Sequence, residues 1–253
     1  MKDWSGTLNG KNLFGEIVRK KNTGRIKDLP NYSDGIWWVQ SAAASIPVKI
    51  ICNFFKKEDY SKINILEVGA APGGKTIQLC DNKFNVTAID VSQKRINKLK
   101  QNLERVNYDA EVLNIDVNKW KTKKKFECIL IDAPCSATGI INKKPEIILH
   151  KNNLDLSNLQ KKQKNILNNS AKLLGNDGLI VYVVCSLITE ESVNQIINFL
   201  DENKEFKLLK LSNKLLDNIK INIIDGMAYV TPICYELEGG MDGFFIACLI
   251  KQE

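Results

Sequence analysis

Histidine is almost absent from this sequence, because His150 is the only one in 253 residues. A Ser-His-Asp triad or a Cys-His protease would have to use it. It follows an apolar run in the polar, Lys-rich stretch IILHKNN, which favours a solvated position over a buried catalytic one. The sequence therefore argues against the histidine-dependent hydrolase classes.

Clustered cysteines and long apolar runs are missing as well. The seven cysteines are an odd number and contain no CxxC pair, so we expect no zinc or other metal site and no disulfide framework. No stretch is long and apolar enough to span a bilayer, and the N-terminus lacks the pattern of a secretory signal. We therefore expect a cytoplasmic protein without a membrane partner.

The formal net charge of +7 favours a polyanionic partner such as a nucleic acid. The basic residues are spread along the chain, and Lys, Asn and Ile are abundant everywhere, so a merely Lys-rich composition explains the charge equally well. Lys143 and Lys144 could contact RNA phosphates or could form a solvated turn. Trp37 and Trp38 could stack a base, although packing anchors are the more common role for such residues.

Strand and helix patterns alternate from Lys62 onward. Apolar strands are predicted at residues 63–68, 84–90, 110–116, 126–134 and 178–186, and helices at residues 74–82, 92–107, 157–175 and 189–201. Two later strands are predicted at residues 206–211 and 243–251, with a loop region between them. The alternation predicts an α/β fold, a doubly wound, mostly parallel sheet with one antiparallel strand near its end.

The chain divides into two regions of different composition. Residues 1–35 are polar and rich in Gly and Lys, which predicts a loop-rich N-terminal arm. Residues 36–253 form the main domain, and the apolar residues of 36–56 could cover one of its faces. Sheets of this kind bind ligands outside the carboxyl ends of their strands, so the site is expected there.

A glycine-rich loop, LEVGAAPGGKT, follows the first predicted strand. Its small residues let a ligand approach the backbone, and the next helix offers free N–H groups. From Gly69 to Thr76 the loop matches the phosphate-loop pattern GxxxxGK(S/T), and Asp132 could hold magnesium, so a phosphate-loop NTPase is one hypothesis. Pro72 weakens it, because proline has no N–H to offer a phosphate. A tight turn that binds nothing is a further interpretation.

Two carboxylates end the second and third predicted strands. Asp90 stands where a nucleoside-binding sheet places its ribose-binding carboxylate, and an ionised acceptor suits ribose hydroxyls. A helix pattern begins directly after Val91-Ser92, so Asp90 could instead cap that helix. Asp116 could lie near an adenine edge, or it could cap a helix in turn.

Two cysteines follow the fourth and fifth predicted strands. Asp132-Ala-Pro-Cys135 and Cys185-Ser186 would converge beside the glycine loop, because those strand ends open on the same crevice. Each cysteine alone is more often a core residue, but together they make a candidate site. A thiolate that adds to C6 of cytosine makes C5 nucleophilic, and Lys75 is a candidate cation to favour that thiolate.

Several segments resemble successive motifs of the NOL/Sun (Fmu-like) family of RNA cytosine-C5 methyltransferases, and of its bacterial ribosomal-RNA members most closely. These segments are LEVGAAPGGKT, AIDVSQKRINKLKQNLERV, FECILIDAPCSATGII, VYVVCSLITEES, DLSNLQKKQKNILNNSAKLL and EGGMDGFFIACLIK, which together cover about residues 26–251. The PCS and CS motifs together are specific, whereas the glycine loop alone is not. The resemblance implies a Rossmann-like methyltransferase domain over residues 36–253, S-adenosyl-L-methionine as cofactor, and ribosomal or transfer RNA as partner.

The resemblance also implies a role for each motif residue. The cofactor-binding residues would be Gly69, Ala70, Ala71, Pro72, Gly73, Gly74, Lys75, Asp90, Asp116 and Asp132. Asp90 would hold the ribose, Asp116 would lie beside the adenine, and Asp132 would sit between cofactor and base. Cys185 would be the nucleophile and Cys135 would aid product release. DNA cytosine methyltransferases instead use a Pro-Cys nucleophile, which keeps Cys135 as the rival.

The sequence departs from the family pattern in three places. Members of the bacterial type usually carry an RNA-binding domain before the catalytic core, and here we expect only the arm. Ser41 stands where the family typically has Asp, and Glu191-Ser192 replaces a common Glu-Asn. A non-catalytic RNA-binding remnant of the family is therefore a third hypothesis, beside the methyltransferase and the NTPase.

Overall fold

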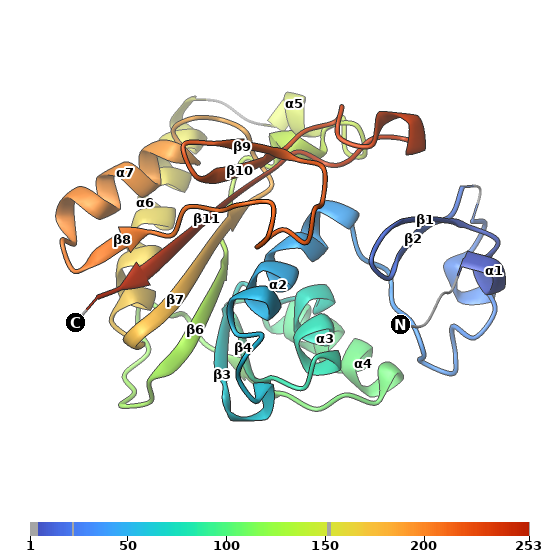
Figure 1. Ribbon diagram of the computed structural model, residues 1–253, viewed down its shortest axis with the longest axis horizontal. Coiled ribbons are helices and arrows are strands. Elements are labelled where there is room, and N and C mark those ends of the chain that lie inside the picture. Colours follow the sequence, from blue (N-terminus) through green and yellow to red (C-terminus); the bar gives the residue numbers. More distant parts are fainter. Residues whose placement is uncertain (1–4, 22, 151–152, 253) are drawn as a thin grey trace.

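The computed structural model describes residues 5–21, 23–150 and 153–252. Its centre is a nine-stranded sheet of order β5-β4-β3-β6-β7-β11-β10-β9, with β8 paired to β11 (Figure 1). The parallel strands are β3 (Asn64–Val68), β4 (Asn85–Asp90), β5 (Glu111–Asn114), β6 (Phe126–Asp132) and β7 (Leu174–Val184). This parallel half confirms the predicted α/β class.

Helices cover both faces of the sheet, as the doubly wound prediction requires. One face packs against α2 (Ala42–Phe54), α3 (Gly74–Asp81) and α4 (Gln93–Val106), and the other against α6 (Asn153–Ala171) and α7 (Val193–Glu202). Cys128, Ile129, Leu130 and Ile131 of β6 are all fully buried. Burial on both faces explains why this strand reads as a continuous apolar run rather than an alternating one.

The antiparallel part of the sheet is larger than predicted. It contains β8 (Phe206–Leu208), β9 (Asn222–Ile224), β10 (Met227–Val230) and β11 (Phe244–Lys251), so the prediction of one antiparallel strand was wrong. The missed hairpin β9–β10 turns at Asp225-Gly226, where both residues have positive φ. An Asp-Gly pair between apolar runs is the usual signal for such a two-residue turn, so the sequence did contain it.

Several element boundaries differ from the predictions. The predicted helix 157–175 is α6, which begins earlier and ends at Ala171, and the predicted strand 178–186 is β7, which begins at Leu174. The predicted helix 189–201 is α7, which starts only at Val193, after a turn that contains Glu191. The predicted strand 110–116 ends at Asn114, so Asp116 lies in the turn beyond β5.

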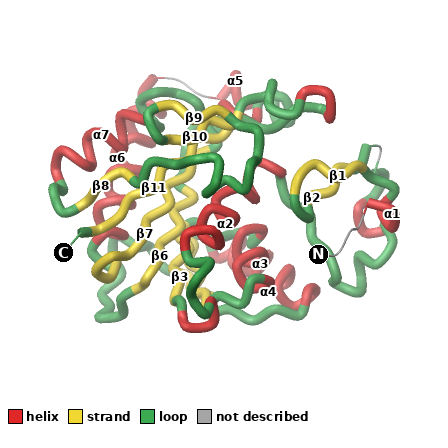
Figure 2. Tube along the Cα trace, viewed as in Figure 1, coloured by secondary structure: helices red, strands yellow, loops and turns green. Residues whose placement is uncertain are grey.

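The first 35 residues stand beside the sheet rather than within it. They contain α1 (Ser5–Leu8) and a two-stranded hairpin of β1 (Lys11–Phe14) and β2 (Ile17–Arg19), which is separate from the main sheet in Figure 2. The short helix α5 (Ile147–His150) and four 3-10 turns at residues 26–28, 60–62, 138–140 and 236–238 complete the secondary structure that is described. None of the helices in the described ranges is long and apolar enough to cross a membrane.

Arg105 at the end of α4 fastens the arm to the domain. Its guanidinium donates to the carbonyl oxygens of Tyr32 (2.7 Å) and Trp37 (3.1 Å) and lies 4.2 Å from the centroid of the Tyr32 ring. Gly35 is buried against the same residue: a Cβ on Gly35 would come within 1.8 Å of the Arg105 carbonyl oxygen. The close approach leaves room only for glycine at position 35.

We expect Gly35→Ala to destabilise the protein more than Gly24→Ala. Both glycines have left-handed φ angles, +70° and +61°, so both variants carry a backbone cost of about 1–2 kcal/mol. Only Gly35→Ala adds a collision, worth about 1–3 kcal/mol more, because nothing lies within 4 Å of a Cβ at Gly24. Urea unfolding of the two variants measures the difference, and equal midpoints would contradict the tight packing of the arm.

Candidate active site

The carboxyl ends of the parallel strands border a cavity of about 280 Å³. Its lining brings together six of the predicted site residues: Gly69, Asp90, Asp116, Asp132, Cys135 and Cys185. Apolar side chains of Ile89, Val117 and Ile166 complete the wall. A second cavity is lined by the loop residues Ala70, Ala71, Pro72, Gly74 and Lys75 and shares Asp132 with the first, whereas Gly73 lines neither cavity.

The glycine loop keeps most of its N–H groups for the protein itself. The amides of Gly69 and Ala70 both donate to the Ile89 carbonyl oxygen at 3.0 Å, and the Gly73 amide donates to Ala70 at 2.9 Å. Pro72 has no N–H, so this stretch has few donors left for a phosphate. Gly73 itself is the N-cap of α3 in a left-handed conformation, which only glycine adopts readily.

The side chains of the loop also argue against the NTPase hypothesis. A phosphate loop needs its Lys on the phosphates and its Thr hydroxyl on magnesium. Here the ammonium of Lys75 pairs with Asp132 at 2.7 Å, and the hydroxyl of Thr76, fully buried, donates to Glu67 at 2.7 Å. Neither side chain is free to bind the phosphates or the magnesium ion of a nucleoside triphosphate.

Asp90 ends β4 with its carboxylate almost fully buried. One oxygen accepts from the Ser92 amide (2.9 Å), and the other accepts from the Ala71 amide (3.3 Å) and pairs with Arg95 (3.1 Å). The N-cap of α4 is Ser92, so Asp90 is not the cap. An ionised carboxylate accepts about four hydrogen bonds, so this one retains an acceptor site for a ligand.

Asp116 lies on the same cavity, in the turn after β5. Its Oδ1 accepts from the amide and the side chain of Asn118, at 3.0 and 2.8 Å, which holds the turn closed. Asp116 caps no described helix and stays on the cavity wall.

A buried ion pair joins the glycine loop to the first cysteine strand. Lys75 is 7 % exposed, and its ammonium lies 2.7 Å from Oδ2 of Asp132. Gly69 makes this approach feasible, because a Cβ there would come within 2.4 Å of the Asp132 carbonyl oxygen. Glu67, which the sequence analysis gave no role, lines the second cavity, and its burial raises the pKa of its carboxyl to about 8.

The two cysteines face each other at the ends of adjacent strands. Their sulfur atoms are 3.4 Å apart, which is within hydrogen-bond reach for thiols. Parallel pairing of β6 with β7, in which Asp132 lies opposite Val183, places the two loops side by side. The amide of Gly139, beyond Cys135, donates to the carbonyl oxygen of Cys185 at 2.9 Å and closes the loop over the pair.

The environments of the two thiols differ in a way that favours charge on Cys185. A hydrogen bond from Cys135 lowers the pKa of Cys185, burial and Asp132 oppose that shift, and Lys75 assists it. The same hydrogen bond, together with burial, raises the pKa of Cys135 well above 9.0. The reactive form of cysteine is the thiolate, and these shifts favour negative charge on Cys185 over Cys135.

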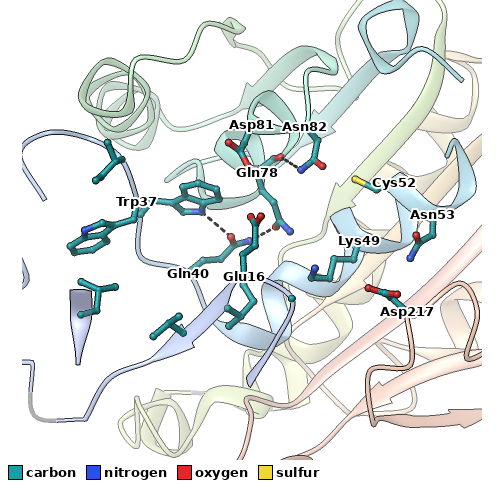
Figure 3. Close-up of a pocket in the computed structure, with 16 residues that line it drawn as sticks. Glu16, Trp37, Gln40, Lys49, Cys52, Asn53, Gln78, Asp81, Asn82 and Asp217 are labelled. Carbon is teal, nitrogen blue, oxygen red and sulfur yellow. Dashed lines mark hydrogen bonds between the residues drawn. The ribbon is translucent and has the colours of Figure 1, made fainter. Parts of the chain in front are cut away.

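Trp37, Trp38 and Lys143, named from the sequence, lie outside the cavity that holds the thiols, although Trp38 also lines the second cavity. Trp37 is buried, and its indole N–H donates to Pro30 at 2.9 Å, so it acts as a packing anchor. Trp38 donates to Gln40 at the wall of a third cavity, between the arm and the helices α2 and α3 (Figure 3). Lys143 forms an ion pair with Asp242 at 2.7 Å. The side chain of His150 lies outside the described residues.

The described residues contain no group of three or more His, Cys, Asp or Glu side chains placed to hold a metal ion. A buried polar cluster behind the cysteines was not predicted from the sequence. In this cluster Glu191 accepts hydrogen bonds from Ser136 and from Gln163. Its sequence signal was weak, because Glu191 sits in a turn and its partners are 55 and 28 residues away.

The family profile of 16S rRNA methyltransferase RsmB/F matches residues 55–250. The chain belongs to this family. A similar relative is ribosomal RNA small subunit methyltransferase B of Serratia proteamaculans, 33 % identical over 244 residues, which cover 94 % of this chain and 52 % of that protein. The chain thus spans about half the length of the curated relatives it matches.

Solved structures agree on the fold. The crystal structure of PH0851 superposes with a TM-score of 0.82 at 25 % identity, over 97 % of this chain and 56 % of that chain. NSun6 from Pyrococcus horikoshii, in a structure with SFG, gives a TM-score of 0.74 at 24 % identity, over 91 % and 57 % of the two chains. The RsmB/F member described here therefore has the Rossmann-like methyltransferase fold expected from its sequence.

Removal of the Cys135 thiol should raise the pH at which Cys185 becomes reactive. The hydrogen bond from Cys135 is the main cause that lowers the pKa of Cys185, so in Cys135→Ala the thiolate forms only at higher pH. Iodoacetamide labelling of Cys185 against pH, read by peptide mass spectrometry, measures the midpoint.

Cys52→Ala is the matched control, because Cys52 lies on the third cavity and burial raises its own pKa to about 11. The Cys185 midpoint should not move in that variant. A midpoint that also stays unchanged in Cys135→Ala would show that the two thiols do not interact.

Proposed function

We propose that this RsmB/F family member transfers a methyl group from S-adenosyl-L-methionine to C5 of a cytosine in RNA. The observation that carries the proposal is the pair of thiols, 3.4 Å apart, on the wall of a cavity that Asp132 and Gly69 of the glycine loop also line. Two cysteines and a carboxylate match what methylation of a pyrimidine carbon requires, which is addition to C6 followed by elimination.

The residues that line the cavity with the thiols suit this cofactor. Gly69 has φ +78°, which glycine adopts readily, so the bare backbone forms that part of the wall. Asp90 offers a buried carboxylate for ribose hydroxyls, and Asp116 stands near the apolar residues Ile89 and Val117, where a purine ring fits. When bound, the cofactor supplies an electrophilic methyl group.

Cys185 would begin the reaction by adding its sulfur to C6 of the cytosine. The ring electrons that this bond displaces make C5 nucleophilic toward the methyl group. The hydrogen bond from Cys135 lowers the pKa of Cys185, with a smaller contribution from the charge of Lys75, so both favour the thiolate without a histidine base. That agrees with a sequence whose only histidine lies outside the motifs of the family.

Asp132 would hold the base during addition. Its Oδ2 is paired with the Lys75 ammonium at 2.7 Å, while its side chain is still 32 % exposed toward the cavity. The other oxygen can therefore face the N3 edge of the cytosine, and a proton carried on it would pass to N3 as the Cys185 sulfur adds to C6 and would return when the ring is restored. Lys75 orients the carboxyl group, so this ion pair would position the base.

Cys135 would complete the cycle. After methylation, C5 loses its proton to a base and the electron pair of that bond restores the ring, so that the C6–sulfur bond breaks and Cys185 leaves as a thiolate. Cys135, 3.4 Å away, donates its hydrogen bond to that departing sulfur. Without this donor the enzyme should stall as a protein–RNA adduct.

Ribosomal RNA is the partner that the relatives support, since the Serratia protein is named for it. Such a substrate would favour a cytoplasmic location. We also propose that residues 36–253 form the catalytic domain and residues 1–35 an arm. The target cytosine would have to be unpaired or flipped out of its stack to reach the cavity.

The proposal predicts methyl transfer that depends on both cysteines in different ways. Purified protein is incubated with labelled S-adenosyl-L-methionine and total RNA from a strain that lacks the gene, and methylcytosine is mapped. Cys185→Ala should lose all labelling, because no adduct forms. Cys135→Ala should accumulate a covalent protein–RNA complex that survives denaturation.

Cys52→Ala serves as the control and should label RNA as the wild type does, because Cys52 lies away from the thiol pair. Activity that survives Cys185→Ala but disappears in Cys135→Ala would overturn the assignment of the nucleophile. Cofactor binding without any labelling of RNA would indicate an RNA-binding remnant, or a core that needs a further RNA-docking part.

A further inference from the structure

Glu191 is a buried carboxylate directly behind the two cysteines. It is fully buried, and it is absent from the lining of the cavity that holds both thiols. Its oxygens accept from the Ser136 amide at 2.8 Å, from the Ser136 hydroxyl, and from the Gln163 amide at 3.0 Å. A carboxylate out of water needs this many donors, so its position is determined by the chain around it.

The bonds of Glu191 hold the residue next to each cysteine. Ser136 follows Cys135, and its hydroxyl lies 3.1 Å from the hydroxyl of Ser186, which follows Cys185. The hydroxyl of Thr138 also lies 3.0 Å from that of Ser186. Glu191 is therefore the anchor of a hydroxyl network that bridges the two cysteine loops and sets how their sulfur atoms face each other.

The hydroxyl of Tyr182 fastens the turn that carries Glu191 by donating to its carbonyl oxygen at 2.9 Å. Gln163 of α6 donates both to Glu191 and to the carbonyl oxygen of Pro134, 2.9 Å away, so the helix supports the Cys135 loop as well. The backbone and the side chain of Glu191 are thus held from separate elements, which leaves the carboxylate little freedom to follow a displaced cysteine loop.

Charges stand on opposite sides of the thiol pair. The hydrogen bond between the two thiols is the largest cause that raises the pKa of Cys135 and lowers that of Cys185, and the carboxylate of Glu191 adds to the rise at Cys135. At Cys185, burial and Asp132 oppose the shift and the charge of Lys75 assists it. A negative charge behind Cys135 disfavours a second negative charge there and keeps the proton on that sulfur.

We propose that Glu191 is a positioning residue that makes the two cysteines unequal: it holds the Cys135 thiol against Cys185 and reserves the negative charge for Cys185. The consequence for methyl transfer rests on the function proposed above, but the consequence for the thiols does not. Glu191 touches neither the cavity nor the reacting atoms, so it acts through Cys135 and Ser136.

The test removes the charge and keeps the shape. In Glu191→Gln, the amide oxygen still accepts from Ser136 N–H and Gln163, and the amide N–H₂ meets the Ser136 hydroxyl, which then accepts. Wild type and variant are labelled with limiting iodoacetamide across a pH series, and the labelled peptides are counted by mass spectrometry. We expect the ratio of Cys135 to Cys185 labelling to rise on the order of tenfold, which corresponds to one unit of pKa.

The exposed neighbour provides the matched control, because Glu190→Gln removes the same charge from the adjacent position outside the cluster. That variant should label as the wild type does. Methylation kinetics then add a second readout: Glu191→Gln should lower kcat and leave KM for RNA unchanged, because Glu191 lies outside the binding cavity.

A second variant keeps the proposal testable even if Glu191→Gln does not fold. Ser136→Ala leaves the carboxylate and its charge in place but removes the hydroxyl that links it to Ser186. Cys135 then loses its fixed approach to Cys185, so the pH midpoint of Cys185 labelling should rise.

Two results would overturn the proposal. One is an unchanged labelling ratio in a folded Glu191→Gln protein, which would mean that the carboxylate does not distinguish the thiols. The other is an unchanged Cys185 midpoint in Ser136→Ala, which would mean that the hydroxyl network positions nothing. If the labelling changes as expected but the wild type methylates no RNA, the positioning role stands and the proposed reaction fails, so the two failures are distinguishable.

Discussion

The parallel pairing of β6 and β7 is the constraint on which the rest of the site depends. It places Asp132 opposite Val183, so that the chain leaves both strands at the same edge and carries Cys135 and Cys185 into contact. The strands themselves are held there by a core that is buried on both faces. A shift of one residue in this register would turn every β7 side chain to the opposite face and separate the thiols.

In a site with two thiols and no histidine, the surrounding charges help to determine which thiol loses its proton. Lys75 stands on the side of Cys185 and Glu191 on the side of Cys135, and each is almost wholly removed from water. Electrostatic interactions are strong in such surroundings, so these fixed charges add to the hydrogen bond between the thiols, which is the largest cause of their difference in pKa. Burial of both charges is costly in itself, which is why each has its own partners, Asp132 for Lys75 and the Ser136 and Gln163 donors for Glu191.

Sequence patterns predicted the parallel half of the fold and the residues that meet at its edge, because each candidate followed an apolar strand directly. They did not predict the hairpin at Asp225-Gly226, where the strands are only three and four residues long and their apolar pattern is weak. The role of Glu191 could not be predicted from the sequence for another reason. Its partners come from a loop and a helix far away in the chain, and only the packing of α6 against the sheet brings them together.

The N-terminal arm is connected to the site through a contact of Arg105 that was not predicted from the sequence. Arg105 holds the carbonyl oxygens of Tyr32 and Trp37, and the stretch it fixes continues into Gln40 and Ser41 on the wall of the second cavity. Ser41 in turn donates to Asp242, which also pairs with Lys143 of the segment beyond Cys135. The N-terminal residues, the Cys135 segment and the start of β11 therefore meet at one buried carboxylate. The arm itself contributes no residue to the cavity that holds the thiols, whereas Tyr32 of the arm lines the second cavity.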